Sequence, residues 1–189
     1  MIQLIQHNKP TLGKEEEEAA LRVLRSGKLA LGQEVELFEQ EFCDFLGLPK
    51  GHAVALSSGT SSLYLALWAL EANGKKILFP AYVCSALRHV VGMIGGIEQL
   101  VDNAKDSPNM DDKKLAKTSH DVSIIPHMYG IPLEFEMNKS PAIEDCCQAL
   151  GAKVNEKFVG LQGDFGIFSF YATKLMTSGG QGGMLISKN

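Results

Sequence analysis

The chain of 189 residues is 45% hydrophobic, which is enough for one domain with a single core and excludes a disordered chain. Its formal net charge of -4 comes with scattered lysines and arginines, so nucleic acid and anionic membranes are disfavoured as partners. Residues 1–18 contain no sustained apolar run, and no later stretch reaches the roughly 18 apolar residues of a membrane span. We therefore expect a cytoplasmic protein that acts on a small ligand.

Cysteine and histidine form no metal-binding pattern in the sequence. Two CxxC pairs, the usual zinc signature, are missing, and adjacent cysteines rarely bridge each other. The isolated histidines have no neighbouring ligands that suggest a metal. We expect no metal site, and free buried thiols at Cys43, Cys84, Cys146 and Cys147.

The first 50 residues are predicted to be helical, and the rest alternates between strands and helices. Apolar residues recur at helical spacing over Glu15–Ser26 and over Gln33–Phe45, where Gly47 closes the helix. From residue 51 onward, short apolar runs punctuated by Gly, Pro or Asp are typical of buried strands in an α/β domain. We expect strands at 53–57, 76–79, 96–101, 122–126, 142–145, 165–170 and 183–187.

Longer segments between these runs predict the helices that cover the sheet. Helices at 61–72 and 83–94, with a weaker one at 111–117, would join parallel strands right-handedly. The connector at 129–142 carries two prolines and receives no confident helix. The predicted fold class is α/β, with three α/β/α layers around a mostly parallel seven-stranded sheet.

The turn Ser57-Ser58-Gly59-Thr60-Ser61 lies between a predicted strand and a predicted helix. Backbone N–H groups at a helix N-terminus favour an anion, so this turn suits a phosphate. An ordinary capped turn explains the same residues about as well. The turn therefore needs support from other segments.

Two further segments carry candidate catalytic groups. Glu144 and Asp145 end a buried strand, at the edge where open α/β sheets bind ligands, and a carboxylate there needs a cationic partner. Lys174 follows another strand, where desolvation would favour its neutral, nucleophilic amine. Separately, Asp145 could cap a turn and Lys174 could face solvent. The ordered set of phosphate turn, aspartate and lysine favours an enzyme.

In this order and at these separations, the three segments closely resemble the DegT/DnrJ/StrS family of sugar aminotransferases, which have the aspartate-aminotransferase fold. The resemblance extends over nearly the whole chain. Besides the three segments it includes Phe38-Glu39, Pro80, the run His127-Met128-Tyr129-Gly130 and the run from Glu144 to Gln148.

The resemblance implies pyridoxal 5′-phosphate (PLP) as the cofactor. It implies that Lys174 is the Schiff-base lysine, that Asp145 pairs with the ring nitrogen, and that Gln148 lies beside the ring. The residues implied to hold the phosphate are Gly59, Thr60 and Ser169. The implied reaction transfers an amino group, usually from glutamate, to a nucleotide-linked keto-sugar for cell-surface polysaccharides or antibiotics. Related dehydratases carry histidine at the lysine position, so Lys174 favours amine transfer.

Members of this family are considerably longer than this chain. The chain is therefore expected to be the PLP-binding large domain over 1–189, with a helical segment at 1–50, an α/β core at 51–189 and no C-terminal small domain. The implied partner is a second copy in a homodimer or a complementary C-terminal half, and uncovered apolar surface should promote self-association. Two further interpretations remain, a non-catalytic remnant or regulatory partner, and one half of a split enzyme.

Three side chains near the expected site have no settled role. Cys84 stands where relatives often carry an aromatic ring that stacks on the cofactor. Tyr82 could replace that ring if the segment is extended. His127 lies at a strand end, where a structural histidine is more common than a catalytic one.

Overall fold

The computed structural model describes residues 10–30, 32–136 and 139–188. Seven strands form one sheet in the order β1-β9-β8-β5-β4-β2-β3, which confirms the predicted α/β fold class. The strands lie close to their predicted positions. They are β1 (Ala53–Leu56), β2 (Lys76–Pro80), β3 (Ile97–Val101), β4 (Val122–Pro126), β5 (Ala142–Asp145), β8 (Phe165–Ser169) and β9 (Gly183–Ser187).

Five helices of the described chain also correspond to the predicted ones. They are α1 (Lys14–Ser26), α2 (Gln33–Leu46), α3 (Gly59–Ala69), α4 (Ala86–Met93) and α5 (Asp112–Lys117). The 3₁₀ turn η1 (Met128–Gly130) and the hairpin of β6 (Lys153–Val154) and β7 (Lys157–Phe158) were not predicted, because segments this short leave no periodic pattern. Across the described residues, no helix combines the length and the apolar composition of a membrane span.

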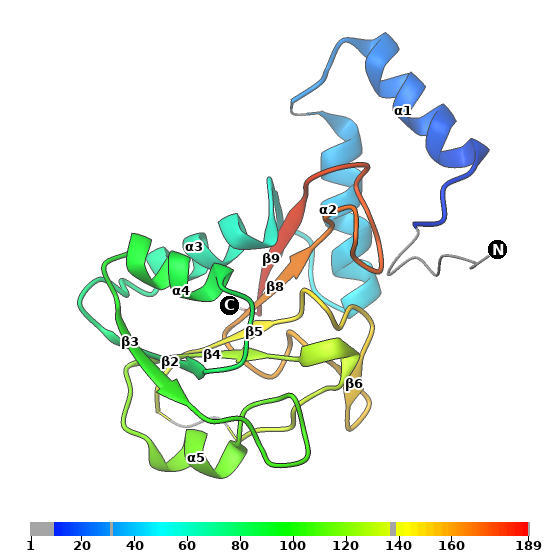
Figure 1. Ribbon diagram of the computed structural model, residues 1–189. Helices are drawn as coiled ribbons and strands as arrows, with labels where there is room; N and C mark the ends of the chain where they lie inside the picture. The colour runs from blue at the N-terminus through cyan, green and yellow to red at the C-terminus, as the bar shows by residue number, and fades with distance from the viewer. Residues whose placement is uncertain (1–9, 31, 137–138, 189) are drawn as a thin grey trace, which may run out of the picture.

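Most neighbouring strands of the sheet run parallel. β3, β2, β4, β5 and β8 are parallel, whereas β9 lies between β1 and β8 and is antiparallel to both. The carboxyl ends of the parallel strands therefore meet at one edge of the sheet (Figure 1). That edge is where α/β sheets of this kind bind ligands.

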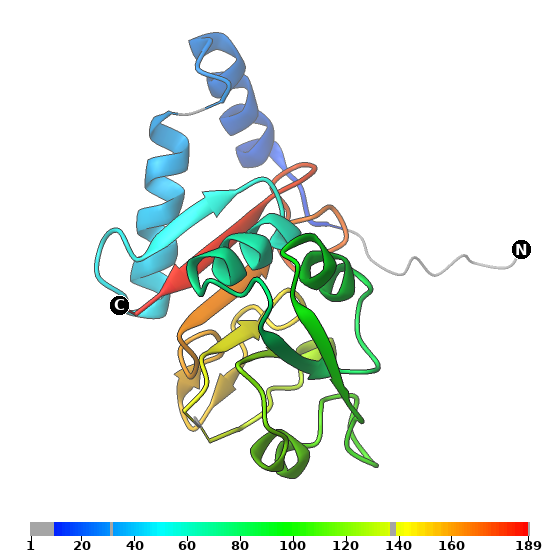
Figure 2. The same cartoon turned by 90° about the vertical axis from the view of Figure 1, so that its left-hand side faces the viewer.

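Helices cover both faces of the sheet, and neighbouring residues of one strand pack against different layers. Ile143 of β5 packs in the cluster that contains α3 and α4, whereas the adjacent Ala142 packs with Leu115 of α5. Likewise Ile167 of β8 packs with residues of α3, and Phe168 packs with residues of α2. Figure 2 shows these two helices on opposite sides of the sheet. The three predicted layers are present, and alternation along β5 directs the side chains of Glu144 and Asp145 to opposite faces.

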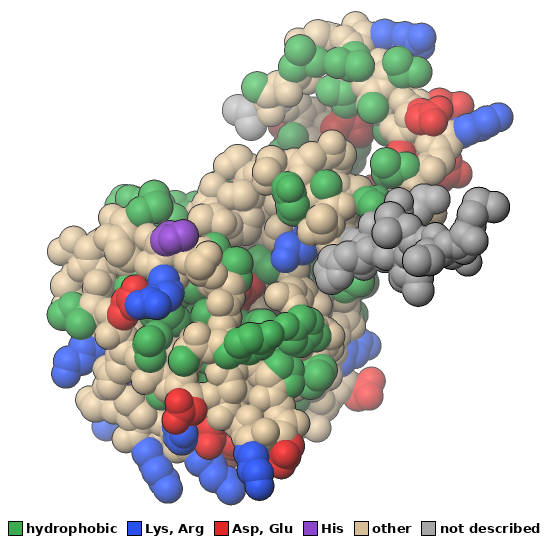
Figure 3. Space-filling model, in the orientation of Figure 1, with side chains coloured by type: hydrophobic (Ala, Val, Ile, Leu, Met, Phe, Trp, Pro, Cys, Tyr) green, Lys and Arg blue, Asp and Glu red, His purple; other side chains and the backbone are tan. Residues whose placement is uncertain are grey.

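Helix α1 stands clear of the sheet (Figures 1 and 2), and none of its described side chains is buried. It ends at Gly27, whose positive φ of 70° suits glycine. Leu21 and Leu24 are 45% and 63% exposed. Hydrophobic side chains lie uncovered along this helix in the space-filling view (Figure 3).

The uncovered apolar face of α1 predicts self-association at high protein concentration, because such surface is removed from water when two copies meet. Light scattering should show an average mass that rises with concentration. A chain with both Leu21→Glu and Leu24→Glu should remain monomeric over the same range. Equal association of the two proteins would exclude α1 as the surface responsible.

Candidate functional site

A cavity of about 300 Å³ opens at the carboxyl edge of the sheet. Its walls come from the start of α3, the end of β5, the end of β8 and the segment before α4. Every site residue predicted from the sequence lines it, although these residues are far apart along the chain. They are Gly59, Thr60, Asp145, Gln148, Ser169 and Lys174.

The phosphate turn forms the N-terminus of α3 at one wall of the cavity. The Ser58 hydroxyl oxygen accepts the N–H of Ser61 at 3.1 Å and thereby caps the helix. The N–H groups of Gly59 and Thr60 belong to the first turn, where an α-helix offers no internal acceptor. The helix dipole and these donors make this wall suitable for an anion.

Glycine is required on both sides of this turn. A Cβ atom on Gly59 would lie 2.8 Å from Cys147 Sγ and 3.0 Å from Ser169 Cβ. A Cβ atom on Gly183 would lie only 2.3 Å from the carbonyl carbon and oxygen of Ser58. The turn therefore sits in contact with β8 and β9, and this contact brings Ser169 next to the start of α3.

Asp145 and Lys174 are brought together around Cys147. The backbone N–H of Cys147 donates to Asp145 Oδ1 at 3.0 Å. Burial raises the pKa of the Cys147 thiol well above its ordinary value, the charge of Asp145 raises it further, and the charge of Lys174 opposes the shift. The carboxylate and the amine are thus within electrostatic reach of the same thiol.

The loop that carries Lys174 is closed by backbone hydrogen bonds between residues just after β8 and residues just before β9. The N–H of Phe170 donates to the carbonyl of Gly182 at 2.8 Å, and the N–H of Ala172 donates to Gly180 at 3.1 Å. A turn follows, in which the N–H of Lys174 donates to the carbonyl of Tyr171 at 2.8 Å. These bonds return the half-buried lysine to the cavity.

Gln148 connects the cavity to two exposed tyrosines at its rim. Its Oε1 atom accepts the N–H of Tyr129 at 3.0 Å, and the hydroxyls of Tyr129 and Tyr82 lie 2.7 Å apart. The chain bends after Pro80 and is not extended, so the condition for Tyr82 to replace the stacking ring is not met. Cys84 itself lines the cavity and is exposed, so the expectation that all four thiols are buried was wrong for Cys84, and Cys147 is only partly buried.

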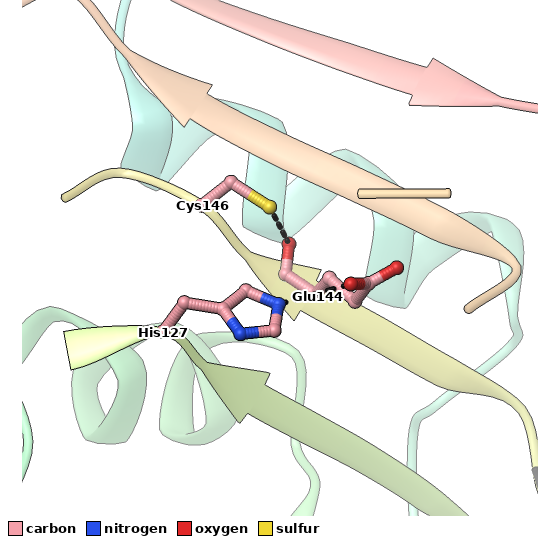
Figure 4. Close-up of side chains that lie close together, drawn as sticks. All are labelled: His127, Glu144 and Cys146. Atoms are coloured by element: carbon pink, nitrogen blue, oxygen red, sulfur yellow. Dashed lines mark hydrogen bonds and ion pairs between the residues drawn. The ribbon is translucent and has the colours of Figure 1, made fainter. Parts of the chain in front are cut away.

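His127 does not line the cavity. It lies 1% exposed behind the end of β5, where its Nε2 atom is 2.9 Å from Glu144 Oε2 (Figure 4). Ligand atoms of His127, Glu144 and Cys146 lie within 4.8 Å of one another. Both Glu144 oxygens already accept backbone N–H groups, and burial raises the pKa of the Cys146 thiol well above its ordinary value. We therefore describe the cluster as a hydrogen-bond network and not as an open set of metal ligands.

Several residues that line the cavity were not predicted from the sequence. The apolar part of the wall comes from Leu63, Leu87 and Ile167, and the polar part includes Tyr171 and Gln181. Leu63 and Leu87 lie near the starts of α3 and α4, so their positions just after the carboxyl edge of the sheet could have indicated them. Gln181 offered no such signal, because it lies in an irregular loop.

Comparison with known proteins gives a consistent result. A profile of the DegT/DnrJ/EryC1/StrS aminotransferase family matches residues 10–189. The UDP-N-acetyl-3-dehydro-alpha-D-glucosamine 3-aminotransferase of Acidithiobacillus ferrooxidans is 32% identical in an alignment 184 residues long, and the match covers 88% of this chain and 47% of that protein. The chain thus spans about half the length of this curated relative.

Two solved structures extend the comparison. The Streptococcus pneumoniae protein Spr1654, described as a sugar aminotransferase and solved in its PLP form, matches with a TM-score of 0.89 and 25% identity, over 98% of this chain and 53% of that one. The Escherichia coli GDP-4-keto-6-deoxy-D-mannose-3-dehydratase, solved with hydrated PLP, matches with a TM-score of 0.89 and 24% identity, over 96% of this chain and 50% of that one. At that identity the second likeness concerns the fold alone.

Proposed function

Because the chain belongs to the DegT/DnrJ/EryC1/StrS aminotransferase family, whose members depend on PLP, we propose that it binds PLP and serves amino transfer to a nucleotide-linked keto-sugar. The observation that carries the proposal is the single cavity lined by an anion-binding helix start, Asp145 and Lys174. The helix start suits a phosphate, Asp145 suits a basic ring nitrogen, and Lys174 suits an aldehyde.

Each part of PLP has a counterpart among the cavity residues. We propose that Gly59, Thr60 and Ser169 hold the phosphate, since the start of α3 supplies N–H donors and Ser169 lies against it. The Asp145 carboxylate would hold a proton on the ring nitrogen, and Gln148 would lie beside the ring. Cys84 and Leu87 contribute less polar surface to the same cavity.

The chemistry divides between the cofactor and the chain. PLP, when bound, supplies an electron sink for the carbon from which the substrate loses a proton. Lys174 would hold the cofactor through Nζ and would accept and return the substrate proton at that atom. Asp145 would keep a proton on the ring nitrogen.

The proposed donor is an amino acid, with glutamate first, and the proposed acceptor is a keto-sugar nucleotide. The acceptor class is supported by the name of the Acidithiobacillus relative, which acts on a UDP-linked 3-dehydro sugar. The presence of Lys174, where dehydratases of the family carry histidine, favours amine transfer over deoxygenation. Such products serve the synthesis of cell-surface polysaccharides or antibiotic sugars.

We propose that residues 1–189 form the large domain of such an enzyme and that the working site is completed by a second copy or by a complementary C-terminal half. The uncovered apolar face of α1 supports a protein partner. The second candidate function is a non-catalytic remnant or a regulatory partner. It would bind PLP without any exchange of amino groups.

The first test is covalent capture of PLP by the chain. Purified protein is incubated with PLP, reduced with borohydride, digested and analysed by mass spectrometry. We expect one reduced adduct, on Lys174, and its loss in Lys174→Arg, which retains the positive charge but cannot form the bond. An adduct distributed over surface lysines, or retained in the variant, would contradict the assignment of Lys174.

The second step separates the two candidate functions. The PLP-loaded chain is mixed with L-glutamate, and 2-oxoglutarate is measured against the protein concentration. Roughly one equivalent would support an aminotransferase half-site, whereas none from a chain that captures PLP on Lys174 would favour the non-catalytic candidate. A nearby lysine variant, Lys188→Arg, should behave like the unaltered chain, since Lys188 bonds the Leu161 carbonyl outside the cavity.

A further inference from the structure

Behind Asp145, on the opposite face of β5, lies a buried pair of titratable side chains that the proposed chemistry does not use. His127 is 1% exposed and Glu144 is fully buried. Their side chains approach from β4 and β5, the two neighbouring strands that end beside the cavity (Figure 4). Burial of such groups is costly unless they are paired and hydrogen-bonded, so the partners of this pair define what it holds in place.

The hydrogen bonds of His127 define the position of its proton. The backbone N–H of Leu133 donates to Nδ1 at 3.0 Å, so Nδ1 is an acceptor and the proton lies on Nε2. Nε2–H then donates to Glu144 Oε2 at 2.9 Å. The imidazole is therefore oriented from both sides.

Glu144 collects donors from a third segment. Its carboxylate accepts the N–H groups of Gly160, Gln162 and Gly163 at 2.7 to 2.9 Å. The segment 159–163 joins β7 to β8, the strand that ends in Ser169. The Glu144 carboxylate thus connects the end of β4, the end of β5 and the segment that leads into β8.

The same network reaches the backbone of Asp145. The N–H of His127 donates to the carbonyl of Asp145 at 3.0 Å, so a single residue contacts Asp145 through its backbone and Glu144 through its ring. Asp145 and Glu144 are adjacent, and neither can rotate about β5 without breaking these bonds. These bonds hold the backbone of Asp145, while the N–H of Cys147, which donates to Oδ1 at 3.0 Å, holds the carboxylate that lines the cavity.

We infer that His127 and Glu144 are positioning residues that hold Asp145 in line with the ring nitrogen of the cofactor. The inference rests on the proposed function, because it concerns the contact that PLP would make. It assigns His127 a role outside the cavity, through hydrogen bonds and without contact to any reacting atom. The chemical consequence is selectivity for a ring that carries a nitrogen.

The test compares PLP with its 1-deaza analogue, in which a C–H group replaces the ring nitrogen. Equilibrium dialysis gives the dissociation constant of each for the full chain. The unaltered chain should prefer PLP by about tenfold or more, the size of a hydrogen bond to a charged group. Because the analogue retains the phosphate and the aldehyde, a change in the ratio of the two constants between the chain and its variants reports on the Asp145 contact.

Two substitutions at His127 separate its two contacts. His127→Gln can place an amide nitrogen near the position of Nε2 and retain the bond to Glu144. His127→Asn can replace the Nδ1 acceptor but does not reach Glu144. We expect the glutamine variant to retain most of the preference for PLP, and the asparagine variant and Glu144→Gln to reduce it toward unity.

A general loss of stability must be distinguished from misplacement of Asp145. Leu115→Ala removes buried side-chain volume in α5, in a cluster away from the cavity. It should weaken binding of PLP and the analogue equally, if at all, so their ratio should not change. Circular dichroism at the dialysis temperature establishes whether each variant is folded. If Glu144→Gln is unfolded, the comparison of His127→Gln with His127→Asn still tests the inference.

The outcomes distinguish the inference from the proposed function. A chain that binds neither compound overturns the proposed function, and the inference with it. A chain that prefers PLP, with the same preference in His127→Asn, overturns the inference alone. An equal loss of preference in Leu115→Ala and His127→Asn would also overturn it, because stability alone would then explain the effect.

Discussion

Replacing Gly183 with alanine is expected to destabilise the chain by about 3 kcal/mol or more and to prevent capture of PLP on Lys174. The new Cβ would lie 2.3 Å from two backbone atoms of Ser58 and 2.6 Å from the Gly59 nitrogen. Backbone atoms cannot rotate away as a side chain can, so either β9 or the phosphate turn must move. Urea unfolding and the borohydride adduct measure the two effects.

A matched control lies three residues earlier in the same segment. A Cβ on Gly180 would meet no atom within 4 Å, and its φ is not in the left-handed region. Gly180→Ala should therefore change the free energy of unfolding by less than about 1 kcal/mol and leave the adduct intact. If both variants behaved alike, contact of Gly183 with the turn would not be the cause.

Replacing Glu144 with glutamine is expected to lower the free energy of unfolding by about 3–5 kcal/mol at neutral pH. The amide retains the volume, but its NH₂ group would face N–H donors that the carboxylate accepted, and one or more of them would lose its partner. Urea unfolding of both proteins at pH 7 measures the difference.

The difference in the free energy of unfolding between the unaltered chain and Glu144→Gln should become smaller at acidic pH. Burial by itself would raise the pKa of Glu144, but the hydrogen bond from His127 and those from Gly163 and Gly160 outweigh it and lower the pKa below its ordinary value. A lowered folded pKa stabilises the protein above the unfolded pKa, and this contribution is lost as the pH falls through the folded value. Glutamine does not titrate, so an undiminished difference at low pH would contradict this account.

The fold was largely predictable because the buried strands carry a strong signal. β4 is buried at every position, and continuous apolar runs of this kind are typical of strands covered on both faces. The hairpin β6–β7 could not be predicted, because its tight turn places Asn155 and Glu156 at positive φ without glycine. Asn155 is a residue type that accepts positive φ, but Glu156 is not, so local propensity is too weak to indicate this turn.

The residues proposed from the sequence come together at one cavity, but neither the rest of its lining nor the side chains behind it were predicted. The position of Asp145 at a strand end was enough to place it at the carboxyl edge of the sheet. The buried role of Glu144 follows from strand alternation with Asp145, a signal that was present in the sequence. The pairing of His127 with Glu144 was not, because it depends on which strands are neighbours in the sheet.

The pairing of β1 with β9 has a consequence for the order of folding. Ala53 pairs with Ile186, so the first and last strands of the sheet become neighbours across most of the chain. Contacts so distant in sequence form late, because a long loop must close before they stabilise anything. During synthesis the helix start that would bind phosphate therefore lacks its contact with Gly183 until β9 has left the ribosome. We expect nascent chains to become able to bind the cofactor abruptly, when the last strand joins the sheet.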